Sequence, residues 1–150
     1  MNSLFAFLHH LAAFTLVAAL AIEFVLIRDA PSVGNARRLL IADAVFGMSA
    51  GAVLLIGLLR VLYFEKGVDY YLNSIPFIAK ASLFAAVGLL SIYPTVEFLS
   101  WRKAVRQGAA PTVSERKLGT LRTIIHLELA GVALLILCAA LMAKGVGMRG

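Results

Sequence analysis

The side chains that could do chemistry in this sequence are ionisable residues set inside long apolar stretches. An isolated charge near the centre of a bilayer costs from about 3 to above 10 kcal/mol, so such residues usually face the interior of a helical bundle and are paired. Counted by depth at about 1.5 Å per residue, they fall into two layers. The outer layer contains His9, His10, Arg60 and Lys80, and the inner layer contains Glu23, Asp43, Glu97, Arg122, His126 and Glu128.

The outer layer has the composition of a cofactor site. Burial favours the neutral form of a lysine amine. Lys80 and a histidine can therefore ligate a flat cofactor such as haem b from opposite sides, while Arg60 holds a propionate. In the alternative, Lys80 and Arg60 extend to the outer surface and the histidines lie at the membrane interface. Beyond a haem iron on His9 and Lys80, no metal site built from protein ligands is expected.

Helical geometry distinguishes the two adjacent histidines. At about 100° per residue, Glu23 falls within about 40° of His9 but about 140° from His10. A helix face that hides Glu23 therefore also hides His9, and we expect His9 to point into the bundle. Both histidines stay candidates for the cofactor site.

The inner layer mixes acids with bases, and two interpretations fit it. In the first, Glu23, Asp43, Arg122, His126 and Glu128 belong to a polar network that neutralises its own charge and fixes the register of the helices. In the second, they form a path for protons or ions. His126 and Glu128 lie about 160° apart around one helix, so they cannot share one partner.

Four apolar segments must position these residues, at about 4–27, 39–63, 75–100 and 118–143. Each is long enough to cross roughly 30 Å of hydrocarbon. With 61% hydrophobic residues and a mean hydropathy of +0.92, a soluble fold could not bury the apolar surface. Because the connections are short, neighbouring helices should be antiparallel. The sequence predicts an all-α membrane protein with a single domain over 1–150, an antiparallel up-down-up-down bundle of four transmembrane helices.

Local motifs add detail to these helices. Ser74 can cap the third helix, and Thr112 with Glu115 has capping-box spacing before the fourth. Gly47 and Gly51 form a GxxxG pair in the second helix, which lets another backbone approach closely. We expect this pair to face the interior of the bundle, with contact between two copies as the alternative.

Basic residues are distributed unevenly between the connections. Nine lie in or beside the connections after the first and third helices: Arg28, Arg37, Arg38, Arg102, Lys103, Arg106, Arg116, Lys117 and Arg122. The opposite side has Lys66, Lys144 and Arg149 outside the helices. The positive-inside rule therefore predicts two cytoplasmic basic connections and both termini outside, in a bacterial inner (plasma) membrane.

Composition also excludes several function classes. The single cysteine, Cys138, excludes an intramolecular disulfide and a thiolate metal cluster. The formal charge of +6 is spread between apolar segments and forms no single basic face, so nucleic acid is not an expected partner. No nucleophile elbow, phosphate-binding glycine loop or HExxH motif is present, which leaves open whether the chain is an enzyme.

Two resemblances add to this interpretation. LHHLAAF near the start and the run YFEKGVDYYLNSIPFIAKASLFAAVGLLSIYPTVEFLSW over 63–101 resemble an uncharacterised bacterial family of four-span membrane proteins, domain of unknown function 2214. That resemblance implies the fold and the membrane location. More distantly, a histidine in the first helix (His9 or His10) and Phe77 with Lys80 in PFIAK resemble the HemJ-type protoporphyrinogen oxidases. This second resemblance implies haem binding in the outer layer. The chain differs from that group after Glu23, where it continues FVLIR in place of a Pro-Arg pair and a Tyr-His ending.

Three functions remain as hypotheses. The first is a haem-b redox protein that exchanges electrons with a quinone or a porphyrin-like substrate in the membrane. The second is a non-catalytic scaffold or an accessory or assembly subunit, whose polar layers specify packing. The third is a small proton-coupled carrier. All three would contact the lipid bilayer, and the sequence leaves open a homodimer or a larger membrane complex.

Overall fold

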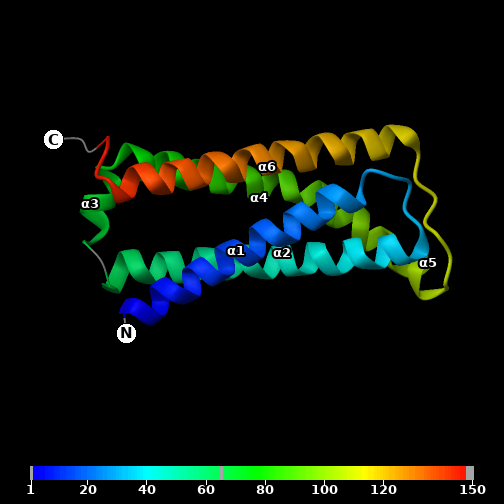
Figure 1. The fold of residues 1–150 in the computed structure, drawn as a ribbon, viewed down its shortest axis with the longest axis horizontal. Coiled ribbons are helices and arrows are strands. Elements are labelled where there is room, and N and C mark those ends of the chain that lie inside the picture. The colour runs from blue at the N-terminus through cyan, green and yellow to red at the C-terminus, as the bar shows by residue number, and fades with distance from the viewer. Residues whose placement is uncertain (1, 65, 148–150) are drawn as a thin grey trace.

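The computed structural model describes residues 2–64 and 66–147, so Arg149 of the predicted outer side lies outside the described residues. Four long helices alternate in direction (Figure 1). They are α1 (Asn2–Leu26), α2 (Val33–Leu59), α4 (Ile75–Ser100) and α6 (Glu115–Ala143). Shorter helical segments are η1 (Arg60–Phe64), α3 (Val68–Leu72) and α5 (Arg102–Arg106). The described residues contain no strand, and four helices are long and apolar enough to span a membrane. The predicted all-α four-helix class is confirmed.

The two ends of the bundle differ in what they carry. The connections α1–α2 and α4–α6, with most of the basic residues, lie at one end, which we call the basic end (Figure 1). The two chain ends and the α2–α4 connection lie at the other, which we call the terminal end. Between the ends, large apolar side chains such as Phe14, Leu89 and Met48 are exposed, as expected for helices surrounded by lipid.

Serine side chains cap three of the long helices. Ser32 accepts the backbone N–H of Asn35 at 3.1 Å, and Ser74 accepts that of Phe77 at 3.4 Å. Before α6 the cap is Ser114, so the expected cap at Thr112 is wrong. The chain is not helical at 109–114. Ser114, which directly precedes the first helical residue, is therefore the hydroxyl that can satisfy an N–H of the first turn.

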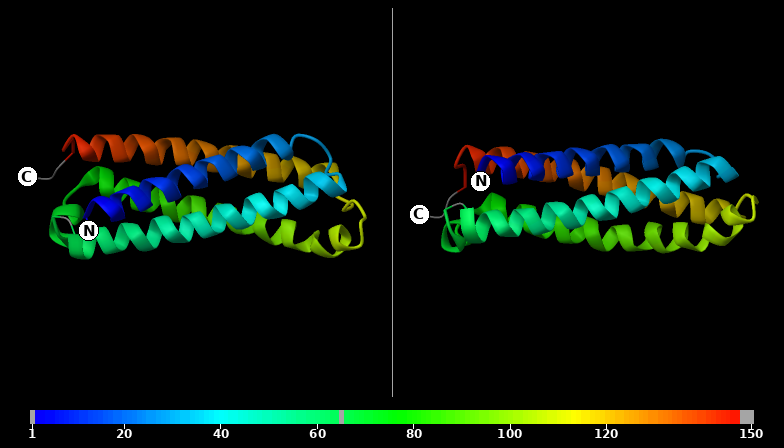
Figure 2. Two further views of the ribbon diagram at one scale, coloured as in Figure 1. Left: turned by 60° about the horizontal axis from the view of Figure 1, so that its bottom comes forward. Right: turned by 90° about the horizontal axis from the view of Figure 1, so that it is seen from below.

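The helices pack as two antiparallel pairs, α1 with α2 and α4 with α6. The further views in Figure 2 show the long helices running along one common axis. Contacts between the pairs are fewer. Fully buried apolar side chains, including Leu20, Leu39, Phe98, Leu121 and Ile125, lie in the half of the bundle nearer the basic end. The pairs are therefore joined by an apolar core in that half.

Close backbone approach occurs at a different glycine from the one expected. A Cβ added at Gly131 of α6 would lie 2.6 Å from Val87 Cγ2 of α4, so this glycine allows the α4–α6 pair to form. A Cβ added at Gly47 or Gly51 would meet nothing within 4 Å among the described residues. The expectation that the GxxxG pair faces the bundle interior is wrong, because α2 turns the face of Ala36, Leu39 and Phe46 inward instead.

Candidate functional site

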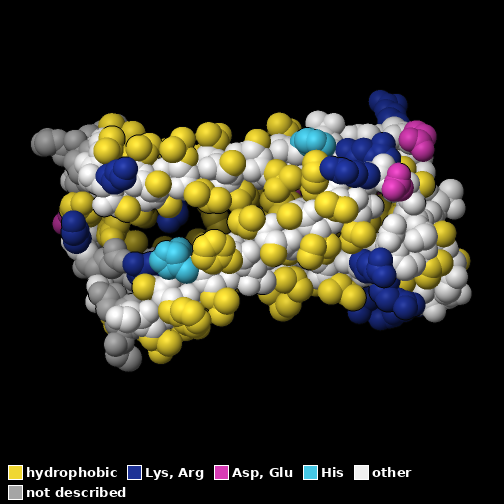
Figure 3. Space-filling model, in the orientation of Figure 1, with side chains coloured by type: hydrophobic (Ala, Val, Ile, Leu, Met, Phe, Trp, Pro, Cys, Tyr) yellow, Lys and Arg dark blue, Asp and Glu magenta, His cyan; other side chains and the backbone are white. Residues whose placement is uncertain are grey.

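A cavity of about 440 Å³ lies between the two helix pairs toward the terminal end. Figure 3 shows it as a hollow in the surface, bordered by histidine and basic side chains. Its lining comes from α1, α2, η1, α3, α4 and α6 and is mostly apolar. Its volume falls within the range of about 300–1,000 Å³ that is usual for small-molecule sites.

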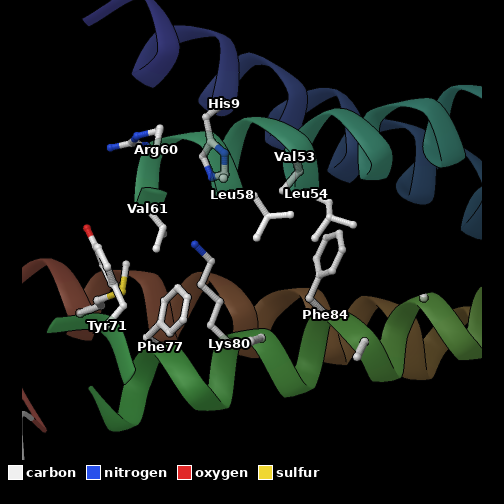
Figure 4. Close-up of a pocket in the computed structure, with 15 residues that line it drawn as sticks. His9, Val53, Leu54, Leu58, Arg60, Val61, Tyr71, Phe77, Lys80 and Phe84 are labelled. Carbon is white, nitrogen blue, oxygen red and sulfur yellow. The ribbon is translucent and has the colours of Figure 1, made fainter. Parts of the chain in front are cut away.

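His9 and Lys80 enter this cavity from opposite helix pairs. His9 lies on α1 and Lys80 on α4, and Figure 4 shows the two side chains pointing into the space between the pairs. The imidazole lies against α2 at Gly57, where an added Cβ would be in ordinary van der Waals contact with it, 3.5 Å from His9 Cε1. An imidazole and an amine thus face a common apolar space.

Arg60 lines the same cavity at the point where α2 ends. It begins η1, a turn of π-helix. Such turns are rare and are often found at functional sites, because they shift side chains out of the regular helical positions. No sequence signal indicated this π-helical turn.

Aromatic side chains complete the lining. Tyr71 of α3 and Phe77 and Phe84 of α4 line the cavity together with Lys80 (Figure 4). The rings of Tyr71 and Phe77 contact each other, with centroids 5.0 Å apart. These aromatic rings provide flat apolar surface in the cavity that the Lys80 amine enters.

His10 is the one member of the outer layer that the structure leaves out of the cavity. Its side chain is exposed, and its Nδ1 donates to the carbonyl of Ala6 at 2.7 Å. The helical-wheel comparison with Glu23 indicated this difference between the adjacent histidines.

In the inner layer, three carboxyl groups are buried together. Glu23 and Glu128 are each 1% exposed and Asp43 is 7% exposed, and Glu23 lies within electrostatic range of the other two. Thr95 Oγ1 of α4 donates to Asp43 Oδ1 at 2.8 Å.

The basic members of the predicted network lie elsewhere. Arg122 donates from Nε to the carbonyl of Ile27 at 3.0 Å and from Nη2 to that of Arg28 at 2.6 Å, which caps the end of α1. His126 is exposed, and its Nδ1 donates to the carbonyl of Arg122 at 2.8 Å. The structure thus brings Glu23, Asp43 and Glu128 together without Arg122 or His126.

Glu97, the remaining member of the inner layer, lies near the basic end. It forms an ion pair with Lys117, at 3.2 Å from Nζ to Oε1, and accepts the indole N–H of Trp101 at 3.3 Å. In the part of the chain that the structure describes, no set of three or more His, Cys, Asp and Glu side chains is arranged to hold a metal ion.

Comparison with known proteins gives a family. No curated protein matches the chain, and no solved structure does. The family described as predicted membrane protein, DUF2214, matches residues 1–147. The chain belongs to this DUF2214 family of predicted membrane proteins.

Proposed function

We propose that the cavity at the terminal end binds a flat apolar cofactor of the haem b type, with His9 and Lys80 as the two ligands. The observation that supports this proposal most directly is the placement of the two side chains. They come from different helix pairs and point into one apolar space from opposite sides (Figure 4). No curated protein matches the chain, so the proposal rests on this geometry and not on the resemblance of His9, Phe77 and Lys80 to HemJ-type proteins.

The remaining lining suits the same cofactor. Phe77 and Phe84 offer ring surface to an apolar macrocycle. The guanidinium of Arg60 is suited to bind a propionate, because its fork of N–H donors matches a carboxylate. The imidazole of His9 lies against α2 at Gly57. A bound haem would supply one-electron redox chemistry. The protein's part is to ligate, orient and exclude water.

The test is the absorption spectrum of protein purified from haem-replete cells. The wild type should show a Soret band, and His9→Ala and Lys80→Ala should each weaken or abolish it. His10→Ala is the matched control for the imidazole, since His10 is exposed and bonded to Ala6. Lys66→Ala, which changes an exposed lysine outside the cavity, is the control for the amine. A Soret band that survives both cavity substitutions would refute the proposed ligands.

A second candidate, a subunit of a homodimer or larger membrane complex, is favoured by one observation. The GxxxG pair Gly47 and Gly51 faces away from the bundle with open space around it, and such pairs let transmembrane helices approach closely. The double substitution Gly47→Ile and Gly51→Ile should then reduce the particle mass in mild detergent. An unchanged mass, or a wild type that is already a monomer, would refute this candidate.

We also propose that the chain resides in a bacterial inner membrane with its basic end in the cytoplasm. The concentration of Arg and Lys at that end supports this orientation through the positive-inside rule. Topology reporters fused after the C-terminus should be active on the outer side of that membrane. Activity on the cytoplasmic side would reverse the orientation.

A further inference from the structure

Each of the four long helices contributes one polar side chain to a cluster inside the bundle. These side chains are Glu23 of α1, Asp43 of α2, Thr95 of α4 and Glu128 of α6. We call this group the polar junction. Since α1 pairs with α2 and α4 with α6, the polar junction lies where the two pairs meet.

The carboxyl groups of the polar junction have few partners. Thr95 donates one hydrogen bond to Asp43. Glu23 Oε1 and Glu128 Oε1 are buried, and neither has a hydrogen-bond partner among residues 2–64 and 66–147. Both side chains are almost completely buried, so bulk water does not satisfy these oxygens. Two buried acceptors thus lack a donor.

The charged groups on the surrounding elements do not neutralise the junction. On α6, Arg122 bonds to the last carbonyls of α1, and His126 is exposed with its ring against Phe24. On α4, Glu97 pairs with Lys117. Within the described residues, none of the three junction carboxyls forms an ion pair, and no set of side chains there is arranged for a metal ion.

Three ionised carboxylates cannot lie together in a buried cluster that has no ion-pair partner. An unpaired charge out of water is so costly that the group neutralises instead, and like charges on neighbouring carboxyls add repulsion. Binding of a proton to a carboxyl group removes its charge, and with it the repulsion. It also supplies an O–H donor to a neighbouring carboxyl oxygen. We propose that the polar junction is a proton-binding site, in which Glu23, Asp43 and Glu128 hold protons taken from water in the folded bundle.

This site is separate from the cavity. Asp43 precedes Val53, which lines the cavity, by ten residues of α2, or about 15 Å along the helix. The buried side chain of Phe46 lies between them in the sequence of α2. The proton site therefore does not depend on the proposed cofactor, and it can be tested in protein without haem.

The direct test is infrared spectroscopy of the full chain in lipid nanodiscs at neutral pH. Protonated carboxylic acids have a carbonyl stretching band that ionised carboxylates lack, and this band should be present in the wild type and shift in D₂O. Glu23→Gln and Glu128→Gln should each reduce it. Glu97→Gln should not, because Glu97 is ion-paired outside the junction. No acid band in the wild type, or a band untouched by both junction substitutions, would overturn the proposal.

The pH dependence of stability gives a second test that needs only the wild type and one folded variant. The folded bundle holds protons on its buried carboxyl groups. The unfolded chain, whose carboxyl groups have ordinary pKa values, releases these protons at neutral pH. Unfolding is therefore favoured as pH rises. The wild-type Tm in detergent should fall through the neutral and alkaline range, more steeply than that of Glu23→Gln or Glu128→Gln. Equal slopes for wild type and variants would also overturn the proposal.

Discussion

Replacing Gly131 by alanine tests the packing that defines the two helix pairs. The added Cβ would lie 2.6 Å from Val87 Cγ2 across the α4–α6 contact. Carbon atoms in favourable contact are about 3.5–4.0 Å apart, so α4 and α6 must separate by about 1 Å or Val87 must change its rotamer. Val87 is buried and β-branched, and its χ1 is therefore restricted.

The size of the effect follows from two opposing contributions. Overpacking of this kind costs typically about 1–3 kcal/mol, while alanine in place of glycine favours the helix by up to about 1 kcal/mol. Gly119→Ala on the same helix isolates the second contribution, since a Cβ there would meet nothing within 4 Å. Gly131→Ala should therefore be about 1–3 kcal/mol less stable than Gly119→Ala.

The assay is reversible unfolding in mild detergent, followed by circular dichroism, for both alanine variants. The same pair is then made in a Val87→Ala background, which removes the atom that the new Cβ meets. In that background the difference between the two variants should largely disappear, which is the signature of a pairwise coupling. Equal stability of the two variants in the wild-type background would refute the proposed close contact.

Three further substitutions test other parts of the structure. Gly88→Leu should fill the cavity, since Gly88 lines it and a Cβ there meets nothing within 4 Å. Haem titration of this variant should show no uptake. The control Gly51→Leu, on the outer surface, should still take up haem. Arg122→Ala removes two hydrogen bonds to carbonyls at the end of α1 and should cost about 1–3 kcal/mol in detergent unfolding. Thr95→Val removes the donor to Asp43 and should cost about 1–3 kcal/mol in the same assay.

The sequence was sufficient for the positions of the four long helices. A run of about 20 apolar residues has to be helical in hydrocarbon, because every backbone polar group must be satisfied internally. The cap at Ser74 is equally local, since it requires only a hydroxyl before the first turn. The inward position of His9 followed from its helical phase relative to Glu23, which must be buried.

The arrangement of the helices could not be derived in the same way. In a membrane, the lipid-facing side of a helix is as apolar as the buried side. The pattern around Gly47 and Gly51 therefore did not show which way the pair faces, and the Gly131–Val87 contact was missed. The cavity depends on how the two pairs meet, and no local sequence signal specifies that.

The partners of Arg122 also depend on tertiary structure. Charge balance suggested carboxylates, yet the guanidinium binds carbonyls more than 90 residues away in sequence, at the end of α1. A helix C-terminus offers unsatisfied carbonyls and a partial negative charge, which can hold an arginine as well as a carboxylate does. Because Arg122 binds these carbonyls, the three buried carboxyls of the polar junction form no ion pair within residues 2–64 and 66–147.

Titration of purified, haem-free protein with haem b tests the central proposal most directly. We expect saturable uptake of one haem per chain, with a Soret band that is shifted from that of free haem and reduced in both His9→Ala and Lys80→Ala. Uptake that does not saturate, or a spectrum that is the same for the wild type and both variants, would contradict it.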